Sequence, residues 1–357
     1  MSKKGLAILF VIIILLTGGL ITAGEMITSK EEAKPAFTGE FSIGENNRLV
    51  YVMEEGDAQH LYVQSENGES QHVYESEGNL EIRSPLFTGE NTIAFISTTG
   101  APEGSPGEQE FQLVHSDVIS VQIESGEEKT LLEARGLMTG LVYDDANSRI
   151  IANGVHISTD KEPEEGFIPY ASGLYTLSME GEFEEIRTID TYSPGSLQIT
   201  EDGKKLLMIL PDDFEDATPE SMFEATERIF EMEIEKPSEM EVVSKEGSDI
   251  PISEFVLFKN GTTLLYQTIM NWGDGGNYLY DHVWFDRSKQ EEGERLHINE
   301  PVLHSMLNDE ETWLYYVRSS RKSNQDEQYD LYRFDLKGDR KEEQVNLGQQ
   351  GSPSEDS

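Results

Sequence analysis

Residues 197–210 read LQITEDGKKLLMIL. Apolar and polar residues alternate in the first part of this stretch, and its last part is almost continuously apolar. Asp202-Gly203 separates the two parts, and both residue types tolerate the positive φ that a tight turn requires, so the pattern predicts a β-hairpin. A second hairpin pattern follows in RIFEMEIEKPSEMEVVS at 228–244, which completes a unit of four antiparallel strands.

This unit occurs six times along the chain, with starts 45 to 58 residues apart at positions 41, 86, 141, 197, 255 and 303. We expect 24 strands arranged as an all-β, six-bladed β-propeller of four-stranded antiparallel blades. A single blade cannot bury both of its faces, so neighbouring blades must stack and the ring must close. One long β-sandwich, or two, is the alternative architecture, but a sandwich does not normally repeat one unit six times.

The start of the third strand in several units carries a Leu-Tyr pair, as in Leu61-Tyr62, Leu174-Tyr175 and Leu331-Tyr332. Thr200-Glu201-Asp202-Gly203 is a degraded form of a Ser-Pro-Asp-Gly turn. In these features the region 37–347 resembles the WD40-like repeats of TolB-type propellers. That resemblance implies a propeller fold and places the chain near partner-binding envelope proteins and the propeller halves of peptidases. The peptidases also need an α/β-hydrolase domain, and we expect none here because ten residues follow residue 347.

The N-terminus predicts a segment that enters the membrane. Lys3 and Lys4 precede the uncharged stretch 6–22, a pattern typical of a signal peptide or a membrane anchor. Thr22-Ala23-Gly24 offers a cleavage site, but no Ala-x-Ala is present. We favour a retained single-pass transmembrane helix in 1–24 with the propeller outside the cytoplasm; cleavage would give a secreted protein. Residues 25–36 then form a linker, and 348–357 form a disordered tail.

Charge and cysteine content exclude several classes of function. The 357 residues include 69 acidic and 27 basic side chains, a formal net charge of −42, and no cysteine. Such a surface repels nucleic acid phosphate, so we expect no nucleic acid partner. The absence of cysteine excludes disulfides, a thiol nucleophile and cysteine-ligated zinc.

We expect the binding face to be the one that carries the long connections between second and third strands, since long loops on a rigid scaffold often carry function. Five of the six connections are long: 98–116, 153–172, 211–227, 270–281 and 319–329. In the third of these loops we expect partner contacts from Phe214, Met222 and Phe223. The same loop has four carboxylates that suit Ca²⁺ or simply face solvent: Asp212, Asp213, Glu215 and Asp216.

The fourth long loop, 270–281, is the second candidate for partner contacts. We expect Trp272, Asp274, Asn277 and Tyr278 to contribute, because exposed aromatic side chains supply much of the energy of protein interfaces. The alternative is that Trp272 packs into the mouth of the propeller. The GDGGN run at 273–277 joins two strands and is followed by no helix, so it is not a nucleotide-binding loop.

Catalytic motifs are absent from the sequence. None of its seven histidines has metalloenzyme spacing, and no Gly-x-Ser-x-Gly appears. We therefore favour a non-enzymatic extracytoplasmic propeller that binds a protein partner or a cell-envelope component through its long-loop face. The alternative is a propeller hydrolase or lyase with a metal in the central channel, which requires inward-facing His, Asp or Glu from several blades.

Overall fold

The computed structural model describes most of the chain between residues 35 and 348. The described residues are 35–99, 114–159, 172–190, 192–218, 221, 224–245, 247–272, 277–296, 298, 300–320 and 328–348. The expected anchor or signal at 1–24 lies outside them, and so does the tail beyond Gly348. In the described part of the chain, no helix has the length and apolar character needed to span a membrane.

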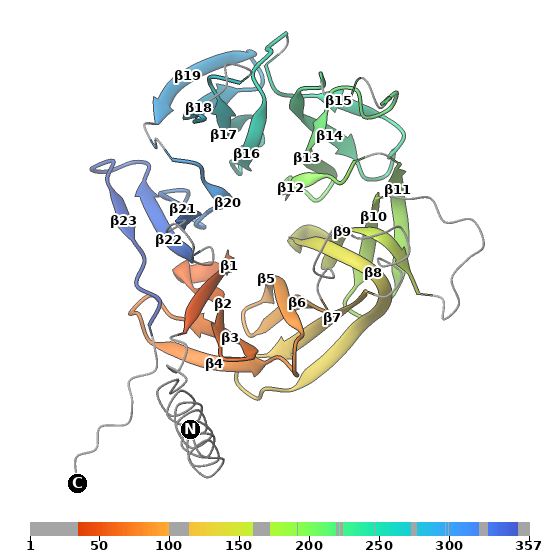
Figure 1. Ribbon diagram of the computed structural model, residues 1–357, viewed down its shortest axis with the longest axis vertical. Coiled ribbons are helices and arrows are strands. Elements are labelled where there is room, and N and C mark those ends of the chain that lie inside the picture. Colours follow the sequence, from red (N-terminus) through yellow and green to blue (C-terminus); the bar gives the residue numbers. More distant parts are fainter. Residues whose placement is uncertain are drawn as a thin grey trace, which may run out of the picture. The chain divides into compact units, whose positions relative to one another are not determined.

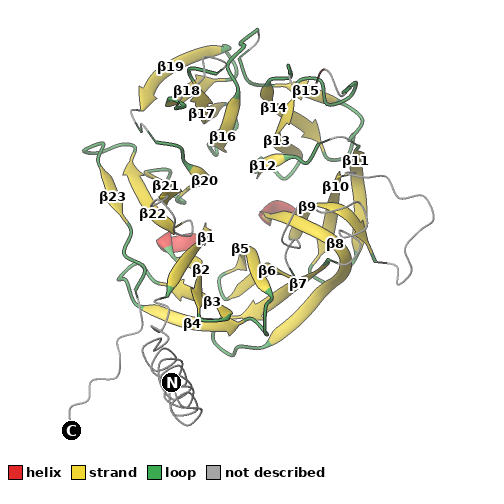
Figure 2. Ribbon diagram, in the orientation of Figure 1, coloured by secondary structure: helices red, strands yellow, loops and turns green. Residues whose placement is uncertain are grey.

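Antiparallel strands make up most of the described residues, and the helical segments among them are two short 3₁₀ turns, Glu45–Asn47 and Asp145–Asn147 (Figure 2). The first sheet holds β1 (Ala36–Ile43), β2 (Leu49–Glu55), β3 (Ala58–Gln64) and β4 (Ser70–Glu75). The second sheet has seven strands: β5 (Glu81–Gly89), β6 (Thr92–Thr98), β7 (His115–Gln122), β8 (Glu128–Asp144), β9 (Arg149–Ser158), β10 (Ser172–Ser178) and β11 (Phe183–Ile189).

Three more four-stranded sheets follow. The third sheet holds β12 (Gly195–Ile199), β13 (Lys205–Pro211), β14 (Glu227–Glu233) and β15 (Met240–Val242). The fourth holds β16 (Ile252–Leu257), β17 (Thr263–Ile269), β18 (Tyr280–Asp286) and β19 (Glu291–Leu296). The fifth holds β20 (Leu303–Leu307), β21 (Trp313–Ser320), β22 (Gln328–Asp335) and β23 (Glu342–Gln344). Within every sheet the strands lie in sequence order, as expected for repeated hairpins.

The sheets are arranged around a central axis, which confirms an all-β propeller-like fold (Figure 1). The expectation of six separate four-stranded sheets needs correction, because the described residues form five sheets. The difference comes from β8, which pairs with β7 through residues 128–135 and with β9 through residues 135–144. The outer strand of one repeat therefore runs without a break into the inner strand of the next, and the two repeats share one sheet.

The core consists of apolar layers between neighbouring repeats. Middle strands such as β6 and β13 are buried along most of their length, because sheets cover both of their faces. One layer joins the first and last sheets, where Phe41 and Tyr51 pack with Val317 and Leu331. This contact closes the ring, and burial of the two faces supplies the main favourable free energy of folding.

Candidate functional site

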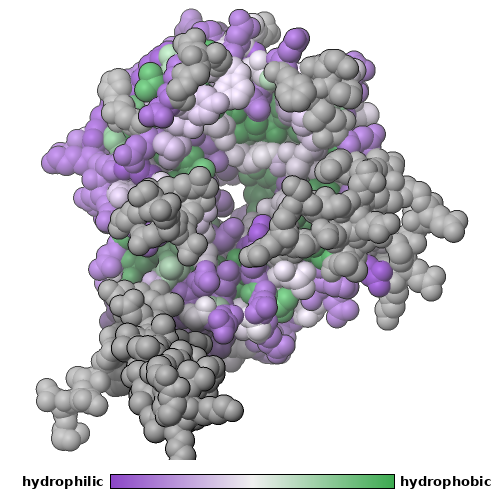
Figure 3. Space-filling view, viewed as in Figure 1, coloured by the Kyte–Doolittle hydropathy of each residue, from purple (hydrophilic) through white to green (hydrophobic). Residues whose placement is uncertain are grey.

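A central channel runs between the inner strands of the ring. The inner strands β1, β5, β8, β12, β16 and β20 all contribute to a cavity of about 570 Å³. Figure 3 shows this opening at the centre of the molecule, with hydrophilic side chains over much of the outer rim. Residues from six points along the chain therefore face one shared space.

Each inner strand has a break in its pairing register where it lines the channel. A β-bulge of this kind turns a side chain away from the regular alternation, and bulges are frequent next to functional sites. Three non-glycine residues at these breaks adopt a positive φ, namely Ser84 (48°), Ser196 (47°) and His304 (44°). Residues with a side chain rarely adopt a positive φ, so the surrounding sheets must hold these three residues in that conformation.

The channel side chains link adjacent strands. Glu40 Oε2 accepts a hydrogen bond from the backbone N–H of Ser84 at 2.8 Å. Ser84 Oγ in turn accepts one from the backbone N–H of Leu141 at 2.8 Å. These two contacts connect β1, β5 and β8, so the polar lining also joins the inner strands of consecutive repeats.

Glu254 and His304 are the titratable channel residues with shifted pKa values. Burial raises the pKa of Glu254 to about 7, although hydrogen bonds from Ser196 and from nearby backbone oppose the shift. Burial lowers the pKa of His304, and the nearby carboxylate of Glu40 opposes that change. A carboxyl group with a raised pKa that shares a channel with an imidazole is suited to proton transfer or to binding a polar ligand.

The same residues do not form a ready metal centre. In the described part of the channel, no three potential ligands bring their donor atoms within 4.8 Å of one another. The convergence of Glu40, Glu254 and His304 nevertheless supplies the inward-facing acids and imidazole that the enzymatic alternative requires.

The sequence contained a signal for this channel that the motif search did not use. Glu40, Ser196 and Glu254 each stand immediately before the first apolar residue of a repeat unit, at 41, 197 and 255. An alignment of the repeats to one another places these three polar residues in one column. Their inward direction depends on the bulges, which the apolar pattern does not reveal.

The loop between β17 and β18 exposes an apolar cluster. Six large apolar side chains of the described residues are exposed, and four of them lie in this loop: Met270, Trp272, Tyr278 and Leu279. The Trp272 and Tyr278 rings stack with centroids 5.6 Å apart, and each side chain is 47% exposed. Trp272 therefore does not pack into the propeller mouth, which was the alternative for this residue.

Hydrogen bonds within this loop hold its two ends together. Asn271 Oδ1 accepts from the backbone N–H of Leu279 at 2.7 Å, and Asn271 Nδ2 donates to the carbonyl of Asn277 at 2.9 Å. Asn277 itself is exposed beside the aromatic pair. Asp274, the fourth residue expected here, lies outside the described residues.

The acidic loop after β13 differs in part from expectation. Phe214 is buried and packs edge-on against Phe230, with centroids 4.9 Å apart, so it belongs to the core rather than to an exposed contact surface. Three carboxylates of the loop have protein partners: Asp212 accepts from the backbone N–H of Thr226, Asp213 from Tyr192, and Glu215 pairs with Arg187. Asp216 is exposed, and Met222 and Phe223 lie outside the described residues. Cation binding by this loop stays a prediction.

No protein-family model matches this chain, and no curated protein is significantly similar to it. Solved structures do share its fold. TolB from Acinetobacter baumannii is 12% identical with a TM-score of 0.55, over 82% of this chain and 62% of the TolB chain. An oligogalacturonate lyase from Vibrio parahaemolyticus is 13% identical with a TM-score of 0.55, over 87% and 79% of the two chains. An oligogalacturonate lyase in complex with manganese is 12% identical with a TM-score of 0.53, over 87% and 85%.

At this level of identity the likeness shows the fold alone. It confirms the resemblance to TolB-type propellers in architecture. The neighbours include both a TolB protein and lyases, so the functional argument must come from the residues of this chain.

Proposed function

We propose that this protein is a non-enzymatic six-bladed propeller, located outside the cytoplasm, that binds a protein partner through its long-loop face. The exposed aromatic pair Trp272 and Tyr278, with Met270 and Leu279 beside it, carries the proposal. Aromatic side chains give large contact area at small entropic cost, and a cluster of exposed apolar groups on an otherwise acidic molecule is typical of an interaction site. The count of six blades takes β8 as a member of two of them.

The charge of the protein narrows the class of partner. A net charge of −42 favours a partner whose surface is basic around an apolar contact, because opposite charges speed encounter and exclude acidic competitors. We propose that 1–24 is a retained anchor, which would confine the search for the partner to the cell envelope. Ca²⁺ held by Asp212, Asp213, Glu215 and Asp216 would be a feature of the same face.

The test is cross-linking in the cells that produce the protein, followed by purification of the full chain through a C-terminal tag. We expect one envelope protein to be recovered in near-equal amount, and to be lost from the double variant Trp272→Ala/Tyr278→Ala. Val242→Ala is the matched control, because Val242 is an exposed apolar residue of a different sheet. Equal recovery of the envelope protein with the wild-type chain, the double variant and Val242→Ala would refute a role for this loop.

The enzymatic alternative has one observation in its favour, namely Glu254 and His304 in the channel. Under this alternative the protein is a hydrolase or lyase that acts on a substrate in the channel with help from a metal ion. Incubation of the purified chain with oligogalacturonate and Mn²⁺ tests it, with release of new chain ends as the readout. Product formation that is abolished by Glu254→Gln and His304→Gln, but unaffected by Trp272→Ala, would replace the binding proposal.

A further inference from the structure

Two histidines and a carboxylate lie together on the first sheet, outside the channel and the aromatic loop. His60 is on β3, and His72 and Glu75 are on β4. His60 pairs directly with Glu75, and Tyr62 pairs with His72. Residues of one strand that are an odd number apart normally point to opposite faces, so His72 and Glu75 would be separated in a regular strand.

A β-bulge removes that separation. The register shifts between Leu61 and Tyr62, so that Leu61 pairs with Tyr74 while Tyr62 pairs with His72. The extra residue on β4 is Val73, and it brings His72 to the same face as His60 and Glu75. The bulge thus assembles three potential ligands that a regular pair of strands would keep apart.

The donor atoms are already close. His60 Nδ1 lies 3.1 Å from His72 Nε2, and one donor atom from each of the three residues lies within 4.8 Å of the other two. It is the one such group among the described residues. Zinc binds imidazole nitrogen at about 2.0–2.1 Å with tetrahedral geometry, which places two bound nitrogens about 3.3 Å apart.

The surroundings hold the imidazoles in place. The ring of Tyr62 meets the ring of His72 edge-on, with centroids 5.3 Å apart. Tyr62 donates a hydrogen bond to Glu55 Oε1 at 2.9 Å and stacks on Tyr51, so its position is fixed from two sides. The three ligands therefore sit on paired strands with a supporting layer beneath them, as a preorganised metal site requires.

We propose that His60, His72 and Glu75 bind one divalent transition-metal ion, with Zn²⁺ as the ion that suits two imidazoles and one carboxylate. His72 and Glu75 are exposed, so the ion can enter from solvent and its remaining coordination positions are open to water or to a partner's side chain. The competing explanation of the short nitrogen–nitrogen distance is a hydrogen bond between the two imidazoles. If the two imidazoles do no more than share this hydrogen bond, the three residues have no affinity for Zn²⁺.

Calorimetric titration of the chelator-treated full chain with Zn²⁺ distinguishes the two explanations. Excess Mg²⁺ in the buffer occupies the many surface carboxylates, which are hard oxygen ligands. We expect one equivalent of Zn²⁺ to bind, and His60→Gln, His72→Gln and Glu75→Gln each to weaken binding at least tenfold. His115→Gln, which changes an exposed histidine of the next sheet, should leave affinity unchanged.

Thermal unfolding gives a second readout that does not depend on calorimetry. Zn²⁺ should raise the midpoint of the wild-type protein and of His115→Gln, but not that of His72→Gln, because a ligand that binds only the folded state stabilises it. Thermal unfolding midpoints measured without metal establish that the variants are folded. An absence of stoichiometric Zn²⁺ binding by the wild-type chain, or full affinity in the variants of His60 and His72, would overturn the proposal.

Discussion

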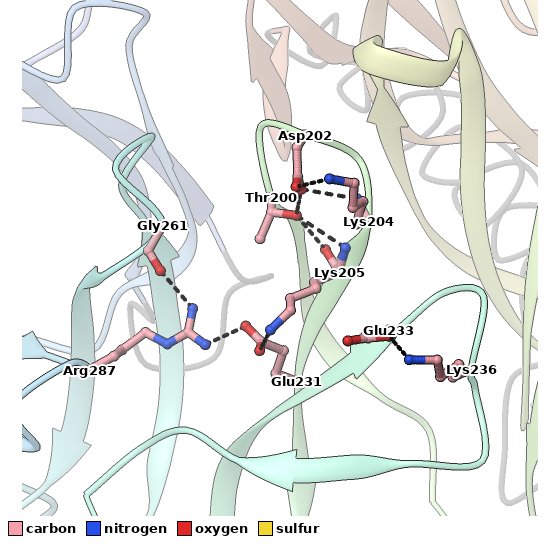
Figure 4. Close-up of polar contacts among 9 residues, drawn as sticks. All are labelled: Thr200, Asp202, Lys204, Lys205, Glu231, Glu233, Lys236, Gly261 and Arg287. Carbon is pink, nitrogen blue, oxygen red and sulfur yellow. Dashed lines mark hydrogen bonds and ion pairs between the residues drawn. The ribbon is translucent and has the colours of Figure 1, made fainter.

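Arg287, which follows β18, donates a hydrogen bond to the buried carboxylate of Glu231 on β14 and so ties the third sheet to the fourth (Figure 4). Lys205 Nζ donates to the other oxygen of Glu231 at 2.6 Å, and Arg287 also donates to the carbonyl of Gly261 at 2.8 Å. The Glu231 side chain is 3% exposed and that of Arg287 is 13% exposed. A single carboxylate thus pairs with two cations at the boundary between two sheets.

Replacement of Glu231 should destabilise the ring strongly. Glu231→Ala leaves Arg287 and Lys205 without their common partner, and removal of one member of a buried ion pair costs about 3–5 kcal/mol. Glu233→Ala is the control, since Glu233 is two residues away on the same strand and pairs with Lys236 in solvent. Its midpoint in urea should hardly change, because exposed pairs contribute little. Equal losses in the two variants would contradict this account.

Gly136 marks the point where β8 passes from one repeat to the next. Its φ is +99°, and a Cβ there would lie 2.3 Å from the carbonyl oxygen of His156. Gly126 has a φ of +68° but nothing within 4 Å of a Cβ, so it serves as a matched control. We expect Gly126→Ala to lower the free energy of unfolding by about 1–2 kcal/mol because of backbone strain. Gly136→Ala should lower it by about 1–3 kcal/mol more because of the clash with the His156 carbonyl. Urea unfolding measures both, and similar losses would show that β8 accommodates the side chain.

The hairpins were predictable because their turn chemistry is local. Asp202-Gly203 and Asn260-Gly261 required no knowledge of distant residues, and Gly203 and Gly261 do adopt the positive φ that the sequence predicted, at 66° and 68°. The repeat of that local pattern was enough to predict an all-β propeller. The continuity of β8 was not predictable, because the repeat pattern assigns the residues before and after Gly136 to two separate units, which start at 86 and 141.

The positions of the candidate site residues were predictable only where the prediction concerned exposure alone. Trp272 and Tyr278 stand in a glycine-rich loop, and that composition favours an exposed position. Phe214 stands in an acidic loop, which also favours an exposed position, but it packs against Phe230 of the neighbouring strand. The grouping of His60, His72 and Glu75 depends on a one-residue bulge, which changes the face of His72 without any change in the apolar pattern.

The last described residues close the ring onto the first sheet. Tyr51 donates to the carbonyl of Gly348, and Gln64 donates to the carbonyl of Asn346, each at 3.0 Å. Val345 and Leu347 pack against the apolar layer between the first and last sheets. The backbone N–H of Val345 also donates to the carbonyl of Leu331 at 2.9 Å. Removal of residues 345–357 should therefore lower the free energy of unfolding by about 3–5 kcal/mol, from three hydrogen bonds and two partly buried apolar side chains.

A shorter truncation provides the control for ring closure. Removal of residues 349–357 leaves every contact named above intact, so its unfolding midpoint in urea should equal that of the full chain. The difference between the two truncated proteins isolates the four residues 345–348. If both truncations unfold at the wild-type midpoint, the closing contacts contribute nothing to stability.

Glu254 should make stability fall as pH rises. Its pKa is about 7 in the folded protein and 4.5 in the unfolded chain, so between these values the folded state retains a proton that the unfolded state has lost. The loss of folding stability caused by Glu254 is absent below about pH 4.5 and grows between pH 4.5 and 7. It levels off above pH 7, at an upper estimate of about 3 kcal/mol. Glu254→Gln cannot ionise, so it should gain stability relative to the wild-type protein between pH 5 and 8.

The measurement is the difference in unfolding free energy between the wild-type protein and Glu254→Gln at each pH. A difference is needed because burial lowers the pKa of His282 to about 4, which makes wild-type stability rise over part of the same range. Glu233→Gln is the control: the pKa of that exposed carboxyl is lowered by Lys236, so its contribution changes only at lower pH. A pH-independent difference for Glu254→Gln would mean that the channel leaves this carboxyl with its ordinary pKa.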